Sequence, residues 1–201
     1  MDTASNSASS FLLSIDTVKT LRRYSGDSIT LEVKYEDWNV DNPNLVDSAF
    51  YQKYLKNRKE FCAYVGLNPK GTTYCRQHYF GMISRPNGNL KDVLILQTWN
   101  PLAELFLLRF NENQQLADVF QVASILGDGY KESIRRSILL SNDNLTLYTV
   151  KWSTADMIIY LDSNKYQICS DSISENYRWL NSKYVSTAVK DSVRSCKWVA
   201  N

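Results

Sequence analysis

Histidine is almost missing from this 201-residue chain, and the single copy, His78, excludes any metal site built on two histidines. The four cysteines, at positions 62, 75, 169 and 196, form no CxxC pair, so the spacing of a zinc ribbon is missing too. A G-x-S-x-G nucleophile elbow is also lacking, and Gly127-Asp128-Gly129 lies between predicted strands, without the following helix and glycine-lysine pair that a phosphate-binding loop requires. No motif therefore identifies a cofactor.

Neither sign of charge dominates, and long apolar runs are lacking. The 23 basic and 21 acidic residues leave a formal charge of +2, which gives no reason to expect a nucleic-acid partner. No apolar stretch has the length of a membrane span, and Phe11-Leu12-Leu13 is too short for the core of a secretion signal. We therefore expect a soluble protein of the cytoplasm or plastid stroma, with cysteines that are free thiols rather than two disulfides.

The chain does have enough apolar material for one domain, with 44% hydrophobic and 12% aromatic residues. Residues 1–9 are small and polar and predict a disordered leader, which leaves 10–201 as a single domain. Apolar residues recur at helical spacing over 10–23 and over 50–65, and this predicts two short helices. The second helix carries the only dense basic cluster, Lys53, Lys56, Arg58 and Lys59.

Strand patterns fill most of the remaining sequence. Residues 28–37 alternate between apolar and polar side chains, which predicts a half-buried strand. From residue 72 onward, short runs rich in β-branched and aromatic residues are separated by turn chemistry. The strands predicted there are 72–82, 92–99, 103–111, 116–126, 130–140, 145–152, 156–161, 165–172, 176–189 with a break near Asn181, and 193–199.

The fold class that follows is mainly β with two short helices (α+β), an antiparallel meander of about ten strands that closes into a lipocalin-like barrel. Closure is expected because an open sheet of this length would leave two exposed edges. The interior of such a barrel holds either packed side chains or one small ligand, and the sequence leaves both alternatives open.

The stretch TTYCRQHYFG crowds rare residue types together. In a strand, one face carries Tyr74, Arg76, His78 and Phe80, while Cys75 points to the other face. A Cys–His nucleophilic pair needs hydrogen-bond contact, so this alternation argues against such a pair within the stretch. His78 is expected to be either a structural residue or part of a ligand-binding face.

Arginines and aromatics recur along the predicted strands. An inward-facing arginine is costly unless it pairs with an anion such as a ligand carboxylate, and aromatics are typical linings of apolar pockets. Solvent-facing arginines and a solid aromatic core are the alternatives. No catalytic or metal-binding residue stands out, and the candidate ligand-binding residues are Tyr74, Arg76, His78, Trp99, Arg109, Trp152, Glu175, Arg178, Trp179 and Arg194.

Three segments carry a resemblance to a known family. A strand beginning GDSITLEVKYEDW between two helices, the hairpin LLRFNENQQLADVFQVAS and the closing segment SENYRWLNSKYVSTAVKDSVRSCKWV together resemble lipocalin-like (calycin) barrels, in particular S-type phycobiliprotein lyases and related cyanobacterial fatty-acid-binding domains. The resemblance implies that Glu175 matches the acid that precedes two bilin-binding arginines. Those arginine positions fall near Ser186 and Ala188 here, so Arg178 or Arg194 would have to substitute.

Three functional hypotheses follow. The first is binding of a small apolar or amphiphilic ligand with a carboxylate, a tetrapyrrole (bilin) or fatty acid, by a carrier or chromophore-attachment chaperone; as an enzyme, such a protein would be lyase-like. The alternative is a non-catalytic protein-interaction module that acts through its surface, using the basic helix and an exposed strand edge. A thiol enzyme that uses Cys75 or another cysteine with His78 is the least favoured hypothesis.

Overall fold

The computed structural model describes residues 22–24, 28–38, 44–63, 75–84, 91–99, 102–127, 132–140, 146–160 and 165–200. The predicted leader and most of the first predicted helix lie outside these residues. The strands are β1 (Arg22–Tyr24), β2 (Ser28–Leu31), β3 (Arg76–Ser84), β4 (Lys91–Trp99), β5 (Leu102–Phe110), β6 (Leu116–Gly127), β7 (Glu132–Leu140), β8 (Thr146–Tyr160), β9 (Lys165–Leu180) and β10 (Lys183–Ala200). Three short helical turns accompany them, η1 (Tyr35–Trp38), α2 (Ser48–Phe50) and η2 (Tyr51–Leu55).

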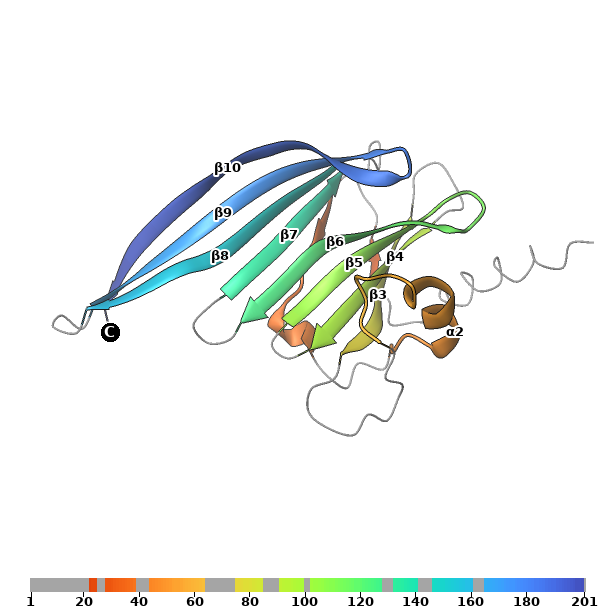
Figure 1. Cartoon of the computed structure of the whole chain (residues 1–201), viewed down its shortest axis with the longest axis horizontal. Helices are drawn as coiled ribbons and strands as arrows, with labels where there is room; N and C mark the ends of the chain where they lie inside the picture. Colours follow the sequence, from red (N-terminus) through yellow and green to blue (C-terminus); the bar gives the residue numbers. More distant parts are fainter. Residues whose placement is uncertain are drawn as a thin grey trace, which may run out of the picture.

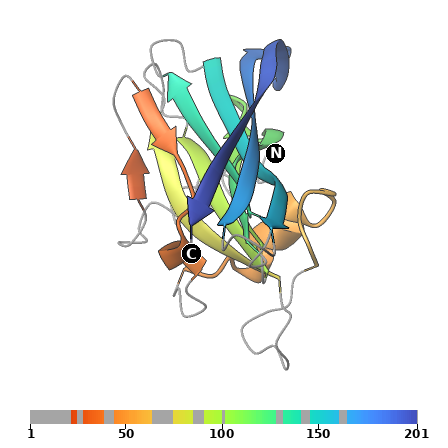
Figure 2. The ribbon, with the colours of Figure 1, turned by 90° about the vertical axis from the view of Figure 1, so that its left-hand side faces the viewer.

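The strands from β3 to β10 form one antiparallel meander, in which each strand pairs with the next along the chain (Figure 1). The sheet is strongly curled, as Figure 2 shows from its end, and has the shape of a half-barrel. At the β3 edge of the sheet, the short strand β1 pairs with β3 in parallel. The other short strand, β2, pairs antiparallel with residues 137–140 of β7. Gly81 lies where β1 crosses close to β3, because a Cβ there would come within 2.8 Å of the Arg22 carbonyl oxygen.

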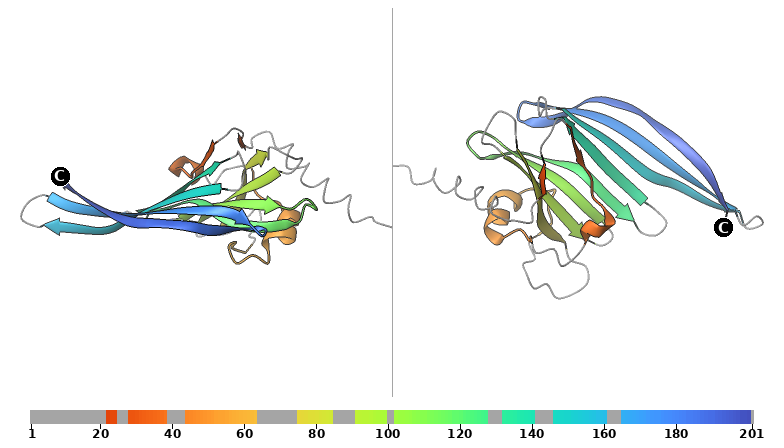
Figure 3. Two further views of the ribbon diagram at one scale, coloured as in Figure 1. Left: turned by 90° about the horizontal axis from the view of Figure 1, so that it is seen from above. Right: turned by 180° about the vertical axis from the view of Figure 1, so that it is seen from behind.

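The predicted meander is confirmed, but its closure into a barrel is not. Among the strands that the structure describes, β10 pairs with β9 alone, and the outer neighbour of β3 is β1. Strands β8–β10, which we call the arm, run on beyond β7 as a three-stranded ribbon (Figure 3). We call β1–β7 with the helical turns the body. An up-and-down barrel needs its last strand to return to its first, and here the last three strands point away.

The arm also corrects the predicted strand lengths. Five strands were expected after residue 145, whereas three long ones are present. The predicted break between 152 and 156 is a register shift between Thr154 and Asp156, and β10 bends at similar shifts. A β-bulge redirects a strand without ending it, and small polar residues favour bulges and turns alike. The expected break near Asn181 is confirmed, because Asn181 and Ser182 form the β9–β10 turn with positive φ.

The helical predictions hold only in part. The second helix was expected over 50–65, but the helical residues are 48–55, and Asp47 caps them by accepting a hydrogen bond from the Phe50 N–H. The first predicted helix extended to residue 23, which is wrong at that end because Arg22–Tyr24 is β1. Strand 28–37 is β2 and then a 3-10 turn over 35–38. Of the apolar face predicted for it, Ile29, Leu31 and Val33 are buried, whereas Tyr35 lies in the turn and is 56% exposed.

Strands β3 to β5 are buried on both faces. On one face α2 and η2 pack Phe50 and Leu55 against the sheet, and on the concave face β2 packs Leu31 against it. Four consecutive residues of β4, Val93 to Leu96, are therefore 0% exposed. Such a continuous apolar run is typical of a strand that is covered on both sides.

The expectation of free thiols is wrong. Cys62 is bonded to Cys75, and Cys169 is bonded to Cys196. The first disulfide ties the segment after η2 to the start of β3, and the second joins directly opposite residues of β9 and β10 in the arm. The spacing of cysteines in a sequence does not reveal which of them meet in space.

Candidate functional site

The histidine stretch belongs to the packed core. Tyr74 lies outside the described residues, Arg76 is half-buried, and His78 is 1% exposed opposite Leu96. Phe80 is part of the concave core, and the guanidinium of Arg22 lies 4.3 Å from the centre of its ring. This face of β3 is therefore filled by protein side chains.

The thiol-enzyme hypothesis loses its nucleophile, because the sulfur of Cys75 is bonded to that of Cys62. A thiolate is the attacking species in such enzymes, and a disulfide sulfur cannot supply it. No free cysteine occurs anywhere in the described residues. Those residues also bring together no group of three His, Cys, Asp or Glu side chains suited to a metal ion.

Two predicted site residues, Arg109 and Trp179, meet at the end of the concave core. Arg109 forms a buried ion pair with Asp92, with Nη2 at 2.9 Å and Nε at 3.0 Å from the same carboxylate oxygen. The guanidinium carbon lies 4.7 Å from the Trp179 ring centre and 5.2 Å from that of Tyr184. The charge of Arg109 is thus balanced within the protein, and its flat face holds the β9–β10 hairpin to the body.

Aromatic packing anchors the arm beside β6. Strands β6 and β7 pair only over residues 124–127 and 132–135, and then separate. Beyond that point Phe120 of β6 stacks against Tyr177 and Tyr184, with ring centres 4.7 and 5.1 Å apart. The Tyr184 N–H donates to Asp118, and burial raises the pKa of that carboxyl group. Where β6 and β7 no longer share backbone hydrogen bonds, these side-chain contacts therefore hold the base of the arm against β6.

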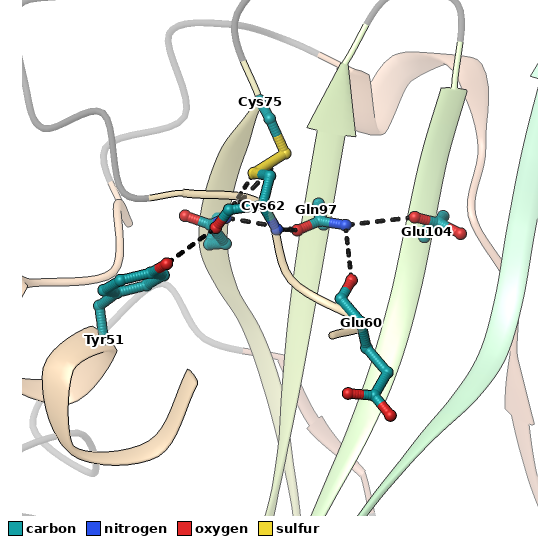
Figure 4. The surroundings of a disulfide bond; sticks show 7 residues. Tyr51, Glu60, Cys62, Cys75, Gln97 and Glu104 are labelled. Carbon is teal, nitrogen blue, oxygen red and sulfur yellow. Dashed lines mark hydrogen bonds between the residues drawn. A yellow bond between two sulfur atoms is a disulfide. The ribbon is translucent and has the colours of Figure 1, made fainter. Parts of the chain in front are cut away.

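A chain of side-chain hydrogen bonds begins at the Cys62–Cys75 disulfide (Figure 4). Gln97 is 1% exposed, and its carbonyl oxygen accepts the Cys62 N–H at 2.9 Å. Its amide nitrogen donates to the Glu60 carbonyl at 3.1 Å and to Glu104 at 3.2 Å. Neighbouring Gln77 donates to the carbonyl oxygen of Cys62. Two buried glutamines thus fasten the segment after η2 to β3 and β4.

The same chain of bonds continues toward the arm. Gln121 donates to the second oxygen of Glu104 at 2.6 Å, and Arg135 donates to Gln121 at 3.0 Å. Arg135 also lies 3.7 Å from Glu175 of β9. Burial raises the pKa of Glu104, while the hydrogen bond from Gln97 and the charge of Arg135 act in the opposite direction. Both carboxylate oxygens of Glu104 already accept amide donors, so this row of residues clamps strands together and offers no open acid–base pair.

The remaining predicted residues do not converge. Trp99 is 36% exposed at the end of β4, and Trp152 is in β8 opposite Ser172. Arg178 is exposed in β9, and Arg194 is exposed in β10. Glu175 contacts Arg135 rather than either arginine that the resemblance would require. The structure therefore brings together Arg109 and Trp179, and leaves the other candidates spread over body and arm.

The longest accessible edge of the described sheet is β10. Register shifts between Ser186 and Ala188 and between Lys190 and Val193 interrupt its first part, and the pairing then runs regularly from Val193 to Ala200. We call Val193–Ala200 the edge segment. It carries Val193 at 63% and Trp198 at 55% exposure. Sequence reasoning expected an exposed strand edge without locating it, because an edge is defined by the order of strands in the sheet.

No protein family, curated protein or solved structure matches this chain. The likeness to lipocalin-like barrels consequently extends to a curled, mostly antiparallel sheet and no further. No helix in the described part of the chain is long and apolar enough to cross a membrane.

Proposed function

We propose that this chain is a non-catalytic interaction protein that binds a partner polypeptide by strand addition along the outer edge of β10. The observation that carries the proposal is the edge segment, a regular run of strand whose one neighbour among the described strands is β9. An edge of this kind presents backbone N–H and C=O groups that an extended chain can pair with. Pockets or exposed side chains on either side then select the partner.

The surface of the arm supports this proposal. Ile173 of β9, at 37% exposure, adds to Val193 and Trp198 of the edge segment, so three large apolar side chains are exposed on two neighbouring strands. Val193 and Trp198 are five residues apart and therefore lie on opposite faces of the arm, and Trp is enriched among residues that dominate binding. The Cys169–Cys196 bond holds the two strands together before a partner arrives, which reduces the ordering that binding requires.

The packed interior is the reason to prefer this function over ligand carriage. The concave face, where a lipocalin-like protein would hold its ligand, is occupied by Leu31, Leu94, Leu105 and Leu107, none more than 1% exposed. Arg109, the most buried of the candidate arginines, is already paired with Asp92. Carriage of a bilin or fatty acid, with or without lyase activity, rests on the resemblance alone. A bound chromophore or lipid in the mass spectrum of the natively purified protein would support it.

We also propose that the protein works in an oxidising compartment, such as the secretory pathway or the cell exterior. Both disulfides contribute to the fold, one at the base of the sheet and one in the arm. Such bonds form and persist where thiols are not kept reduced. Thiol counting by mass spectrometry, on protein alkylated at the moment of cell lysis, should find no alkylated cysteine. Four alkylated cysteines would contradict the proposal.

Strand addition can be tested with linear peptides selected from a displayed random library on the disulfide-intact protein. Trp198→Pro removes the backbone donor at position 198, whereas Trp198→Thr removes only the indole. We expect selected peptides to lose at least about tenfold in affinity with Trp198→Pro, and to slow amide hydrogen exchange in Val193–Ala200 when they bind.

Two controls make this experiment specific. Ile138→Ser removes an apolar side chain of β7 that is 42% exposed and lies outside the arm, and should leave peptide affinity unchanged. Reversing the charges of Lys53, Lys56 and Lys59 tests the basic helix as the rival surface. If charge reversal abolishes binding and Trp198→Pro does not, the interaction site is on the helix and the proposal for the arm is wrong.

A further inference from the structure

At alternate residues of the edge segment, the backbone N–H and C=O groups point away from β9. Cys169 and Cys196 are directly opposite each other, with their Cα atoms 4.1 Å apart. Antiparallel pairs this close are the ones that exchange no backbone hydrogen bonds, because the hydrogen-bonded pairs are about 5.5 Å apart. The N–H and C=O of Cys196 therefore point away from β9, toward the open edge.

The regular register extends this assignment along the strand. Arg194 is opposite Asp171 and Trp198 is opposite Gln167, each two residues from Cys196. Both belong to the same class of pair, so their N–H and C=O groups also point to the open edge. Their side chains share one face of the arm with Cys196, because successive side chains of a strand alternate. The edge thus presents Arg, Cys and Trp in order, each with an outward donor and acceptor.

We propose that the edge segment pairs with the same segment of a second copy of this chain, antiparallel and centred on Cys196. This inference rests on the proposed function and names the partner. In this register Cys196 is opposite the second copy's Cys196, and Arg194 is opposite the second copy's Trp198. The outward backbone groups of one strand then meet those of the other, and the result is a continuous sheet with two-fold symmetry.

The side chains favour this register over its neighbours. Across the two-fold axis each guanidinium meets an indole, and this happens twice, a pairing that is attractive for arginine and tryptophan. In the same register position 195 is opposite position 197 of the second copy. Centring the pair on 195 or 197 would place Arg194 opposite Cys196 or Ala200 and lose both contacts.

The chemistry also favours a second copy over an acidic peptide as occupant. The positive charge of Arg194 has Asp171 opposite it in β9, which reduces the demand for a negative partner. The edge presents an indole that is 55% exposed and an exposed guanidinium, each two residues from Cys196. In the two-fold register each side chain of one kind lies opposite one of the other kind. The register shift before Val193 limits the seam to residues 193–199 of each copy, so the dimer should be weak and concentration-dependent.

Exchanging the residues at positions 194 and 198 tests the proposed pairing. Sedimentation velocity should show a monomer–dimer equilibrium of the full chain between about 1 µM and about 1 mM. Trp198→Arg places arginine opposite arginine twice and should weaken dimerisation by about tenfold. The double variant Arg194→Trp with Trp198→Arg recreates the two pairs with their members exchanged, and should recover dimerisation to within about threefold of the wild type.

Amide exchange gives a readout that needs no variant. Exchange at the amides of Arg194, Cys196 and Trp198 should slow as protein concentration rises, while the amides of Ser195 and Lys197, which face β9, should be protected at every concentration. A dimer that the double variant fails to restore would overturn the register. A chain that stays monomeric throughout would overturn self-association, and if selected peptides still protected the edge, the proposed function would stand without it.

Discussion

Removing one member of the buried ion pair between Asp92 and Arg109 should destabilise the protein strongly, whereas removing both should not. The two side chains are 0% and 3% exposed, so neither charge can be hydrated when its partner is lost. Asp92→Leu should lower the free energy of unfolding by about 3–5 kcal/mol, the usual effect of leaving a buried charge unpaired. Arg109→Met should have a similar effect, because it leaves the carboxylate alone and also releases Trp179 and Tyr184.

The double variant Asp92→Leu with Arg109→Met replaces the pair by apolar groups of similar length. Its free energy of unfolding should lie within about 1–2 kcal/mol of the wild type, because the burial cost of two ions disappears with their attraction. The coupling energy from the cycle should therefore be about 3 kcal/mol or more. The small cost of the double variant, set beside the large cost of each single variant, separates an ion pair that is required once present from one that stabilises the fold outright.

Urea unfolding followed by far-UV circular dichroism provides the measurement, because tryptophan fluorescence would respond to Arg109 directly through Trp179. Equal denaturant slopes for the four proteins are needed for the free energies to be compared. If the single variants each cost less than about 1 kcal/mol, or if the double variant costs the sum of both, the pair is not the isolated buried unit that its geometry indicates.

Three further predictions concern the arm and the row of hydrogen bonds. Burial raises the pKa of Asp118 above its ordinary 3.8, so the folded state binds the proton more tightly than the unfolded state and the free energy of unfolding should fall as pH rises through that raised pKa. Urea titrations from pH 3 to pH 7 should show this slope, and Asp118→Asn should flatten it. Gln97→Leu leaves the partners of four hydrogen bonds unsatisfied and should lower the free energy of unfolding by about 2–4 kcal/mol, with Asn111→Leu as an exposed control. Replacing Cys169 and Cys196 by serine opens a bond that spans 27 residues, and should cost about 3.5 kcal/mol and speed amide exchange in the arm before the body unfolds.

Most strands of the body can be predicted from the local sequence, whereas the number and length of the strands in the arm cannot. The run from Val93 to Leu96 identifies β4 directly, since a strand covered on both faces is continuously apolar. The sequence predicts two strands, 145–152 and 156–161, where the single strand β8 runs through with a register shift between Thr154 and Asp156. A strand in the arm contacts few other elements, so its composition resembles that of a loop, and only cross-strand pairing distinguishes them.

The site depends on contacts that no single segment contains. Arg109 stands out in the apolar run before Asn111, and this made it one of several arginines that could face either an anion or solvent. Its partner Asp92 precedes an equally apolar run, but linking the two requires the register between β4 and β5. The two disulfides were missed for the same reason, because each depends on which residues the folded sheet places opposite one another.

The two halves of β10 differ in how they treat an open edge. Natural sheets discourage unwanted pairing with bulges and lysines, and the first half of β10 has both, with register shifts after Ser186 and Lys190 and a lysine at each end. From Val193 onward the register is regular, and the lysine in this part, Lys197, directs its N–H toward β9. The register shifts that discourage pairing with another strand are thus absent from the part of β10 that carries the exposed Trp198 and the disulfide. An edge that is interrupted by register shifts along one half, and is regular and cross-linked along the other, is the arrangement that the proposed strand addition at one position requires.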